Sequence, residues 1–446
     1  MANYSVQTAS GVKRWQPFPI LSSRKLVFAL TLIALLSSCV MGSIGIGKCI
    51  SRDQIKGIPL AVIGALIAAC AVPLLIFGVP EAKRIEIRNV DSFSDEVTCR
   101  LENGIFVISP SQGSSDDFFP FAERHAAHVR GLIKEHGAVV FNGFNLSERE
   151  FSRASQAITE LPFVPYKGDT PRPLAGDEPN IYPSSVVAPS VMIPLHQEVS
   201  VGERANMPTY FSFFCIVPPE PGTGQTLLGD ALAVTQDIAC EMPDLWEYMK
   251  TRKVTYTMRY LPENTLHTKW IQWWNPSHGT ERRRFGTVDR DKIKAECDAA
   301  GLTCVWDSDG WLTVQRREVP AVTKIDRYTV ICNQMYLDVF NDRLCGDNFF
   351  VRWISYIFAR LILYQTKDTM QFDAWFENGR PMTRQEAGQI ISITKRHQTG
   401  RNWERGDLMI LDNLRKMHGR LPYSDRGKKA EEKRRVIVGL SGRLGD

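Results

Sequence analysis

Short runs of apolar and β-branched residues recur along the chain downstream of about residue 85, and turn-forming residues separate them. A short apolar run between turn signals is typical of a buried strand, whereas a helix shows apolar positions three and four residues apart. These runs predict a domain that is mainly β. The strand-like segments are 138–141, 210–217, 254–258, 329–332, 408–411 and 435–440.

Fewer segments have helical spacing of apolar residues. Residues 119–135 have it, and Gly137 follows in a position typical of a helix C-terminus. Ser147 and Glu150 have the spacing of a capping box, which predicts a helix that runs to about Leu161. Many short strands with a few helices predict an α+β fold, in which a double-sheet barrel or jelly roll carries flanking helices. The other helical segments are 291–300, 351–364 and 383–395.

Two uncharged apolar runs, residues 26–47 and 57–80, precede this globular part. Each is as long as the roughly 20 residues that cross a bilayer core as a helix, so together they predict a two-helix transmembrane hairpin. Lysine and arginine are more frequent on either side of the hairpin than in its loop, which predicts cytoplasmic ends. The expected organisation is a cytoplasmic N-terminal segment (1–25), a membrane hairpin (26–80) and a membrane-tethered catalytic domain facing the cytoplasm (85–446).

Two other interpretations of the apolar runs remain open. The runs are also long enough to be core helices of a soluble domain. Alternatively, Cys39 closes a basic and then apolar stretch in the manner of a lipid-modification site, although the apolar run continues beyond this cysteine.

Charge and cysteine content narrow the function classes. The 54 Lys and Arg residues exceed the 49 Asp and Glu residues by five, and the excess lies in the first 90 residues around the apolar runs. No basic stripe interleaved with aromatic residues follows, so nucleic acid is not an expected partner. The ten cysteines include no Cys-x-x-Cys pair, which argues against a structural zinc site and a dense disulfide framework.

One pair of residues indicates metal chemistry. His196 and Glu198 are two residues apart, so on a strand both side chains project from the same face. By chance about one histidine in this chain would have an acidic residue two positions later, so the pair gains weight only from residues further along the chain. These are Thr226, His418 in the segment 412–420, and the pair Arg434 and Arg435. Two histidines and one carboxylate form the facial triad of non-haem Fe(II) oxygenases, which leaves coordination positions open. A 2-oxoglutarate cosubstrate chelating this metal would need a fixed cation for its distal carboxylate, for which Arg435 and the Thr226 hydroxyl are candidates.

From about Gly137 to the C-terminus the chain resembles the taurine dioxygenase and clavaminate synthase-like Fe(II)/2-oxoglutarate-dependent dioxygenases. The resemblance implies a double-stranded β-helix, or cupin-like jelly roll, with Fe(II), 2-oxoglutarate and O₂ as cofactor and cosubstrates. It implies His196, Glu198 and His418 as iron ligands and catalytic residues, and Thr226 and Arg435 as 2-oxoglutarate contacts. Arg434 is the alternative to Arg435, because a shift of one position in the alignment would exchange them. The matching stretches include residues 137–144, 194–200, 224–226, 285–287, 320–322, 333–334 and 406–420.

The resemblance also implies the reaction class. Family members with a small residue in place of the carboxylate ligand are halogenases, so Glu198 implies hydroxylation of an unactivated C–H bond, with release of succinate and CO₂. A small amino-acid-like or carboxylate substrate is expected, for which Arg172 and Arg420 are candidate cationic contacts. Asn142 departs from the family pattern, because arginine is common at its position. The alternative is a non-catalytic, membrane-anchored scaffold that retains the fold.

Overall fold

A computed structural model describes most of the chain from residue 86 onward. The chain divides into two compact units, Met1–Glu81 and Ala82–Asp446, and every described residue belongs to the second. The described residues are 86–166, 172–176, 178–185, 189, 192–202, 204–265, 268–269, 271–272, 278–336 and 372–444.

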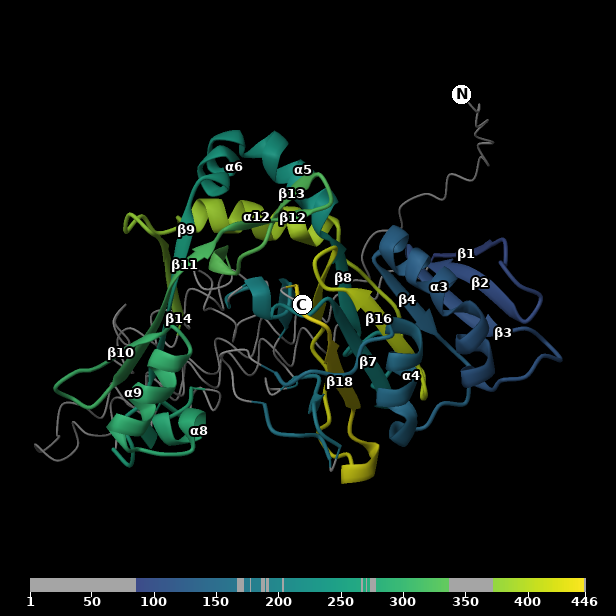
Figure 1. Ribbon diagram of the computed structural model, residues 1–446, viewed down its shortest axis with the longest axis horizontal. Coiled ribbons are helices and arrows are strands. Elements are labelled where there is room, and N and C mark those ends of the chain that lie inside the picture. The colour runs from purple at the N-terminus through teal and green to yellow at the C-terminus, as the bar shows by residue number, and fades with distance from the viewer. Residues whose placement is uncertain are drawn as a thin grey trace, which may run out of the picture. The chain divides into compact units, whose positions relative to one another are not determined.

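An eight-stranded sheet, called the large sheet below, forms one layer of this unit (Figure 1). Strands β3 and β4 pair in parallel and the other neighbours are antiparallel. In spatial order the strands are β1 (Ile87–Val90), β2 (Val97–Glu102), β3 (Ile105–Pro110), β4 (Ala138–Phe141), β16 (Leu408–Asp412), β7 (Tyr210–Val217), β18 (Arg435–Ser441) and β5 (Ile181–Pro183).

A four-stranded sheet, called the small sheet, packs its apolar side chains into the same core as the large sheet. Phe211 and Phe213 of β7 meet Leu228 of β8 in this core, since alternate residues of each strand point inward. The core therefore lies between two sheets, with the small sheet as the layer that carries the chemistry described below. Its strands in spatial order are β15 (Thr399–Gly400), β8 (Thr226–Asp230), β17 (Lys416–Arg420) and β6 (Ile193–His196).

A second four-stranded sheet and a hairpin lie further along the chain, on the left in Figure 1. Helices α8 (Glu281–Phe285) and α9 (Arg290–Ala299) accompany this sheet, and Ile293 of α9 packs in its apolar cluster. The strands in spatial order are β10 (Thr303–Trp306), β11 (Leu312–Pro320), β9 (Lys253–Tyr260) and β14 (Phe372–Phe376), and the hairpin is β12 (Val322–Ile325) with β13 (Tyr328–Ile331).

The longer helices cover the outer faces of the sheets (Figure 1). Helix α3 begins after Asp117, whose side chain accepts a hydrogen bond from the Phe119 N–H, and ends at Gly137, whose φ of 77° suits a residue without a Cβ. Its apolar face packs on the large sheet. The helices are α3 (Phe118–His136), α4 (Phe151–Thr159), α5 (Ala231–Glu241), α6 (Pro243–Lys250) and α12 (Arg384–Arg396), with 3₁₀ turns at Glu148–Glu150, Arg204–Asn206 and Ala430–Glu432.

The prediction of a mainly β domain with flanking helices is confirmed. Strands occur at all six predicted segments, and helices occur at residues 118–136, 290–299 and 384–396. The capping box at Ser147 is present, but it heads a 3₁₀ turn that leads into α4, and α4 ends at Thr159 because Glu160 is left-handed with a φ of 59°. The predicted helix at 351–364 lies outside the described residues.

The predicted membrane localisation requires correction. Within the part of the chain that the structure describes, no helix combines the length and the apolar character that crossing a bilayer requires. The predicted hairpin at 26–80 lies outside that part. The described residues therefore give no support to the predicted membrane-anchored protein with a cytoplasm-facing domain.

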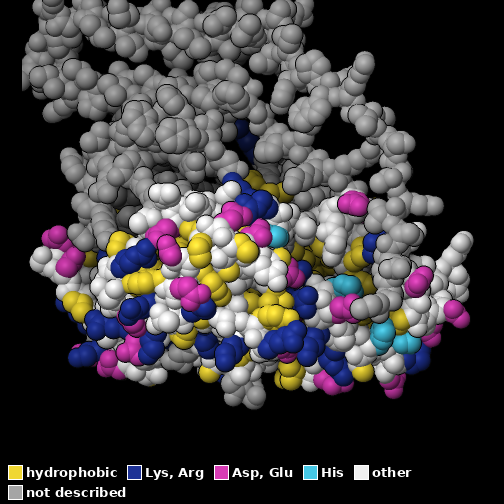
Figure 2. All heavy atoms as spheres, turned by 90° about the horizontal axis from the view of Figure 1, so that it is seen from above, with side chains coloured by type: hydrophobic (Ala, Val, Ile, Leu, Met, Phe, Trp, Pro, Cys, Tyr) yellow, Lys and Arg dark blue, Asp and Glu magenta, His cyan; other side chains and the backbone are white. Residues whose placement is uncertain are grey.

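The surface seen in Figure 2 carries basic and acidic side chains close together. The ion pairs of exposed side chains have the same mixed character, as where Arg396 of α12 pairs with Asp237 and Glu241 of α5. Exposed pairs of this kind contribute about 0–1 kcal/mol to stability, so the fold depends on the buried cores.

One buried histidine predicts how stability depends on pH. His278 is fully buried, and its Nε2 lies 2.8 Å from the Arg259 carbonyl oxygen, to which it donates. Burial lowers the pKa of His278 from 6.5 to about 4. Between these values the unfolded chain binds a proton that the folded chain does not, so we expect stability to fall by roughly 1–3 kcal/mol as pH decreases from 6.5 to 4. Urea unfolding at several pH values measures this loss, and His278→Gln should flatten the slope; an unchanged slope in the variant would contradict the assignment.

Candidate active site

Two histidines lie directly opposite each other on neighbouring strands of the small sheet. His196 at the end of β6 is the antiparallel partner of His418 in β17, and their ring centroids are 4.6 Å apart. The strands approach closely because residue 419 is glycine, and a Cβ there would collide with the Ile193 carbonyl oxygen. Glu198 follows two residues after His196, so all three side chains meet at one point.

The three side chains form a compact set of ligand atoms. Glu198 Oε2 lies 3.3 Å from His418 Nε2 and 3.9 Å from His196 Nε2. One ligand atom from each residue lies within 4.8 Å of the other two. Two imidazole nitrogens and one carboxylate oxygen are a donor set that suits Fe(II) and leaves positions open for other ligands, so the residues present fit the iron site of a non-haem oxygenase.

The His196 ring is held in the form that binds a metal. Its Nδ1 lies 2.9 Å from the Pro194 carbonyl oxygen, to which it donates, so the lone pair is on Nε2 beside Glu198. Burial, together with the neighbouring His418, lowers the pKa of His196 to about 4. The imidazole is therefore neutral at physiological pH and ready to coordinate.

Aromatic packing fixes the second ring. Phe211 stacks on His418 with ring centroids 4.7 Å apart, and Phe213 contacts the same ring edge-on at 5.6 Å. Both phenylalanines come from β7 of the large sheet, so the core between the sheets sets the orientation of this imidazole. His418 is buried, with 5% of its surface exposed.

Arg172 supplies the charge that keeps Glu198 ionised. Its Nη2 donates to Glu198 Oε1 at 3.0 Å and to Oε2 at 3.2 Å. Burial alone raises the pKa of Glu198, but the Arg172 guanidinium and the hydrogen bond with His418 outweigh it, and the pKa lies well below its ordinary value. The guanidinium carbon of Arg172 also lies 4.7 Å from the centroid of the Tyr166 ring.

A second cluster of charge lies next to the metal ligands along the small sheet. Thr226, the first residue of β8, is the antiparallel partner of Arg420, which follows His418 by two residues. Arg434 donates from Nε to the Gly224 carbonyl oxygen at 3.1 Å and from Nη1 to Ser184 Oγ at 3.1 Å. The guanidinium groups of Arg420 and Arg434 both lie over the ring of Tyr423, at 5.0 and 5.1 Å from its centroid, respectively.

The two arginines are buried close to each other. Arg420 is 3% exposed and Arg434 is 9% exposed. Burial lowers the pKa of both groups, and the charge of Arg434 adds to the effect on Arg420, whose pKa is about 10. Two adjacent buried cations are unfavourable unless an anion lies between or beside them, so this cluster is suited to binding a carboxylate.

The structure does not bring Arg435 to this cluster. Its side chain is exposed and forms an ion pair with Glu148, on the face of the large sheet opposite to Arg434. Side chains alternate along β18, and Val436 and Val438 point into the core between the sheets. Arg434 lies two residues before Val436, so the same alternation places its side chain on the core side and that of Arg435 on the other side. This alternation is the sequence signal that separates the two arginines.

Sequence reasoning missed the residues that hold the metal-binding segment in place. The Tyr336 hydroxyl donates to the Leu195 carbonyl oxygen at 2.7 Å. Gln197, which is 1% exposed, donates from Nε2 to the carbonyl oxygens of Ile331 and Leu414 at 3.1 and 3.2 Å. From the sequence, Gln197 between His196 and Glu198 could equally be exposed. Its hydrogen-bonding role is recognised only once the strand is known to be covered on both faces.

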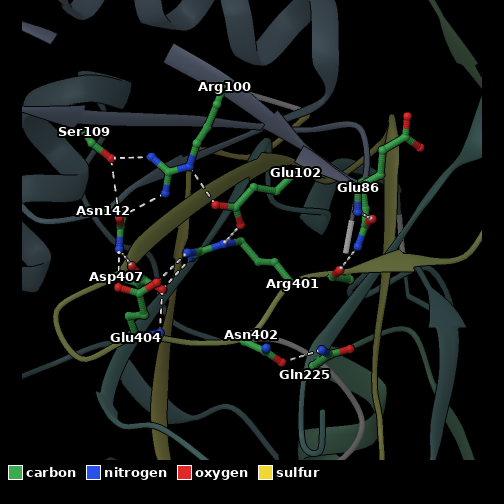
Figure 3. A network of polar contacts seen from close by, with 12 residues as sticks. Glu86, Arg100, Glu102, Ser109, Asn142, Gln225, Arg401, Asn402, Glu404 and Asp407 are labelled. Carbon is green, nitrogen blue, oxygen red and sulfur yellow. Dashed lines mark hydrogen bonds and ion pairs between the residues drawn. The ribbon is translucent and has the colours of Figure 1, made fainter. Parts of the chain in front are cut away.

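A buried polar network lies beside the loop that precedes Thr226 (Figure 3). Arg401 donates from Nε to Glu102 at 2.7 Å and from Nη1 to Asp407 at 2.5 Å. Asn142, which departs from the family pattern, accepts from Arg100 at 3.1 Å and donates to Asp407 at 2.8 Å, so it completes this network.

Asn402, the residue after Arg401, connects the network to the loop before Thr226. Asn402 accepts hydrogen bonds through Oδ1 from the Gly222 N–H at 2.9 Å and from Gln225 Nε2 at 2.7 Å (Figure 3). Gly224, whose carbonyl oxygen binds Arg434, lies between these two residues. Asn402 therefore fixes the loop from which both Thr226 and the acceptor for Arg434 are presented.

Comparison with known proteins identifies the family of this chain. The model of the family described as taurine catabolism dioxygenase TauD, TfdA family matches residues 107–440. A clavaminate synthase-like protein of Arabidopsis thaliana is 22% identical over 317 residues, covering 70% of this chain and 84% of the relative.

The chain is also similar to solved structures. PvcB of Pseudomonas aeruginosa is 13% identical, with a TM-score of 0.39 over 80% of this chain and 91% of that protein. A taurine dioxygenase of Burkholderia xenovorans is 12% identical, with a TM-score of 0.40 over 80% of this chain and 89% of that one. The family model spans most of the chain and both sheets of the core, and the chain therefore belongs to the TauD, TfdA family and is a non-haem iron dioxygenase that uses Fe(II), 2-oxoglutarate and O₂.

Proposed function

We propose that this enzyme binds Fe(II) through His196, Glu198 and His418 and hydroxylates an unactivated C–H bond of a small amino-acid-like or carboxylate substrate. The observation that carries the proposal is the meeting of two imidazoles and one ionised carboxylate beside a pair of buried arginines. Bound Fe(II) with 2-oxoglutarate supplies the oxidation, in which O₂ is consumed, the cosubstrate becomes succinate and CO₂, and one oxygen atom enters the substrate.

The protein supplies preorganised ligands. Because His196 is neutral and Glu198 is ionised before any metal arrives, coordination requires no proton to leave these two groups. The packing of His418 against Phe211 and Phe213 restricts its ring, so the ligand geometry does not need to be assembled on binding.

Arg434, rather than Arg435, is the proposed clamp for the distal carboxylate of 2-oxoglutarate. It is buried, and it reaches the loop that leads to Thr226 through its hydrogen bond to the Gly224 carbonyl oxygen. Arg420, paired across the strands with Thr226, adds a second positive charge at the same place. Guanidinium groups bind carboxylates with paired hydrogen bonds, which suits this role.

Arg172 is the proposed contact for an anionic group of the substrate. It lies against Glu198, and its Nη1 is a buried donor without a hydrogen-bond partner among the residues that the structure describes. A carboxylate on the substrate would satisfy this donor next to the metal ligands. The proposed substrate class is therefore a small molecule that carries a carboxylate near the carbon to be hydroxylated.

A turnover assay with the full chain tests the proposal. Wild-type protein, Fe(II), 2-oxoglutarate and O₂ should form succinate above background when carboxylate candidates are added, and the matched neutral amides should give much less. His418→Ala, which keeps the rest of the site, should form no substrate-dependent succinate. If wild type and His418→Ala both fail to bind Fe(II) and to form succinate, the proposal is wrong and a non-catalytic scaffold is the better interpretation.

A further inference from the structure

The backbone immediately after Glu198 is in a strained conformation. Val199 has a φ of 60°, in the left-handed region that β-branched residues avoid. Such a conformation is unfavourable for a β-branched residue and persists only where the surroundings enforce it. Val199 is also buried, with 4% of its surface exposed, so the turn is packed within the core.

A single amide side chain holds this turn on its N-terminal side. Asn413 is fully buried, and its Oδ1 accepts from the Glu198 N–H at 2.8 Å while its Nδ2 donates to the Glu198 carbonyl oxygen at 3.0 Å. The same Nδ2 donates to the Pro208 carbonyl oxygen at 3.2 Å. Both backbone polar groups of Glu198 are therefore bound by one residue, which fixes the direction in which the carboxylate leaves the chain.

The position of Asn413 links two distant parts of the site. It lies in the turn between β16 and β17, five residues before His418. Glu198 and His418 come from segments about 220 residues apart, yet their side-chain atoms approach to 3.3 Å. Asn413 belongs to the hairpin that carries His418 and is hydrogen-bonded to the Glu198 backbone, so it sets the separation between the two side chains.

We propose that Asn413 is a positioning residue that holds the Val199 turn in its strained form, and thereby aligns Glu198 with His418 for metal binding. The inference rests on the proposed iron site. Asn413 does not touch the metal itself; it acts through the backbone of Glu198. Residues that orient metal ligands in this way typically change metal affinity by about 10- to 100-fold when they are replaced.

Metal titration of the full-length protein tests this role without turnover. Metal-free wild type and Asn413→Ala are titrated with Fe(II) under anaerobic conditions, and with Co(II), whose visible bands report its ligands. We expect Asn413→Ala to bind Fe(II) about 10- to 100-fold more weakly and to give altered Co(II) bands. Adding Val199→Gly to this variant should recover part of the affinity, because glycine adopts a positive φ without steric cost.

The matched control is Asn402, a half-buried asparagine that holds the loop before Thr226. Asn402→Ala should leave Fe(II) affinity within about twofold and raise the 2-oxoglutarate concentration needed for half-saturation. Should Asn413→Ala fail to fold, as judged by melting of the metal-free protein, Asn413→Ser provides the same comparison with a milder change. Wild-type Fe(II) affinity in a folded Asn413 variant overturns the inference, whereas loss of Fe(II) binding in wild type itself overturns the proposed function.

Discussion

Replacing Arg434 with glutamine is expected to raise the 2-oxoglutarate concentration needed for half-maximal turnover by about 100-fold or more. Arg434 is buried, and it donates to two neutral acceptors, the Gly224 carbonyl oxygen and the Ser184 hydroxyl. We expect the distal carboxylate to balance its charge when 2-oxoglutarate binds. Truncating one partner of a buried, hydrogen-bonded charge pair costs roughly 2–5 kcal/mol, and each 1.4 kcal/mol is a factor of ten in affinity.

The adjacent arginine provides a matched control for that experiment. Arg435→Gln removes the same charge one position away, from an exposed side chain that pairs with Glu148. We expect half-saturation by 2-oxoglutarate to stay within about twofold of wild type. Fe(II) affinity measured in the absence of 2-oxoglutarate should be unchanged in both variants. If Arg435→Gln gives the large effect and Arg434→Gln does not, the assignment of the clamp is reversed.

Replacing Arg401 with alanine is expected to lower the free energy of unfolding by about 3–5 kcal/mol. Arg401 is 2% exposed, and the carboxylates of Glu102 and Asp407 both depend on it (Figure 3). Removing it leaves the fully buried Asp407 without its cation and leaves Glu102 with Arg100 alone, which is the costly way to break a buried ion pair. The midpoint of urea unfolding measures the loss, provided that the slope of the transition is unchanged.

The surface offers the corresponding control. Arg396 also pairs with two carboxylates, those of Asp237 and Glu241, but all three side chains are exposed to solvent. Arg396→Ala should cost far less than Arg401→Ala, because solvent screens such pairs. The loss in Arg401→Ala should also shrink at low pH, where protonation neutralises the uncompensated carboxylates. Equal losses in the two variants would show that burial does not determine the strength of these ion pairs.

Much of the sheet architecture was predictable from the sequence, because short apolar runs bounded by turn residues specify strands locally. The segment 210–217 matches the observed β7 at both ends, and 138–141 matches β4. The end of α4 was not predictable in this way, since it depends on a non-glycine residue, Glu160, that adopts a left-handed conformation. Nothing in the local pattern indicates which non-glycine residue will do so.

Part of the candidate site was also predictable from the sequence, and part was not. His196, Glu198 and His418 were identified from spacing and family resemblance, and the structure brings their side chains together. The proposal of Arg434 in place of Arg435 rests on the exposed ion pair of Arg435 and the buried position of Arg434, which the family resemblance alone does not indicate. The contacts of Asn413 and Arg401 join segments more than 200 residues apart along the chain, so no local pattern contains them.

The pairing of His196 with His418 across β6 and β17 makes the proposed iron site sensitive to strand alignment. A slip of one residue in β6 would turn the first histidine toward the opposite side of the small sheet. Only one of the two proposed imidazole ligands would then remain at the site. Under this proposal, the iron content of a preparation should therefore report how much of the protein has β6 and β17 correctly aligned.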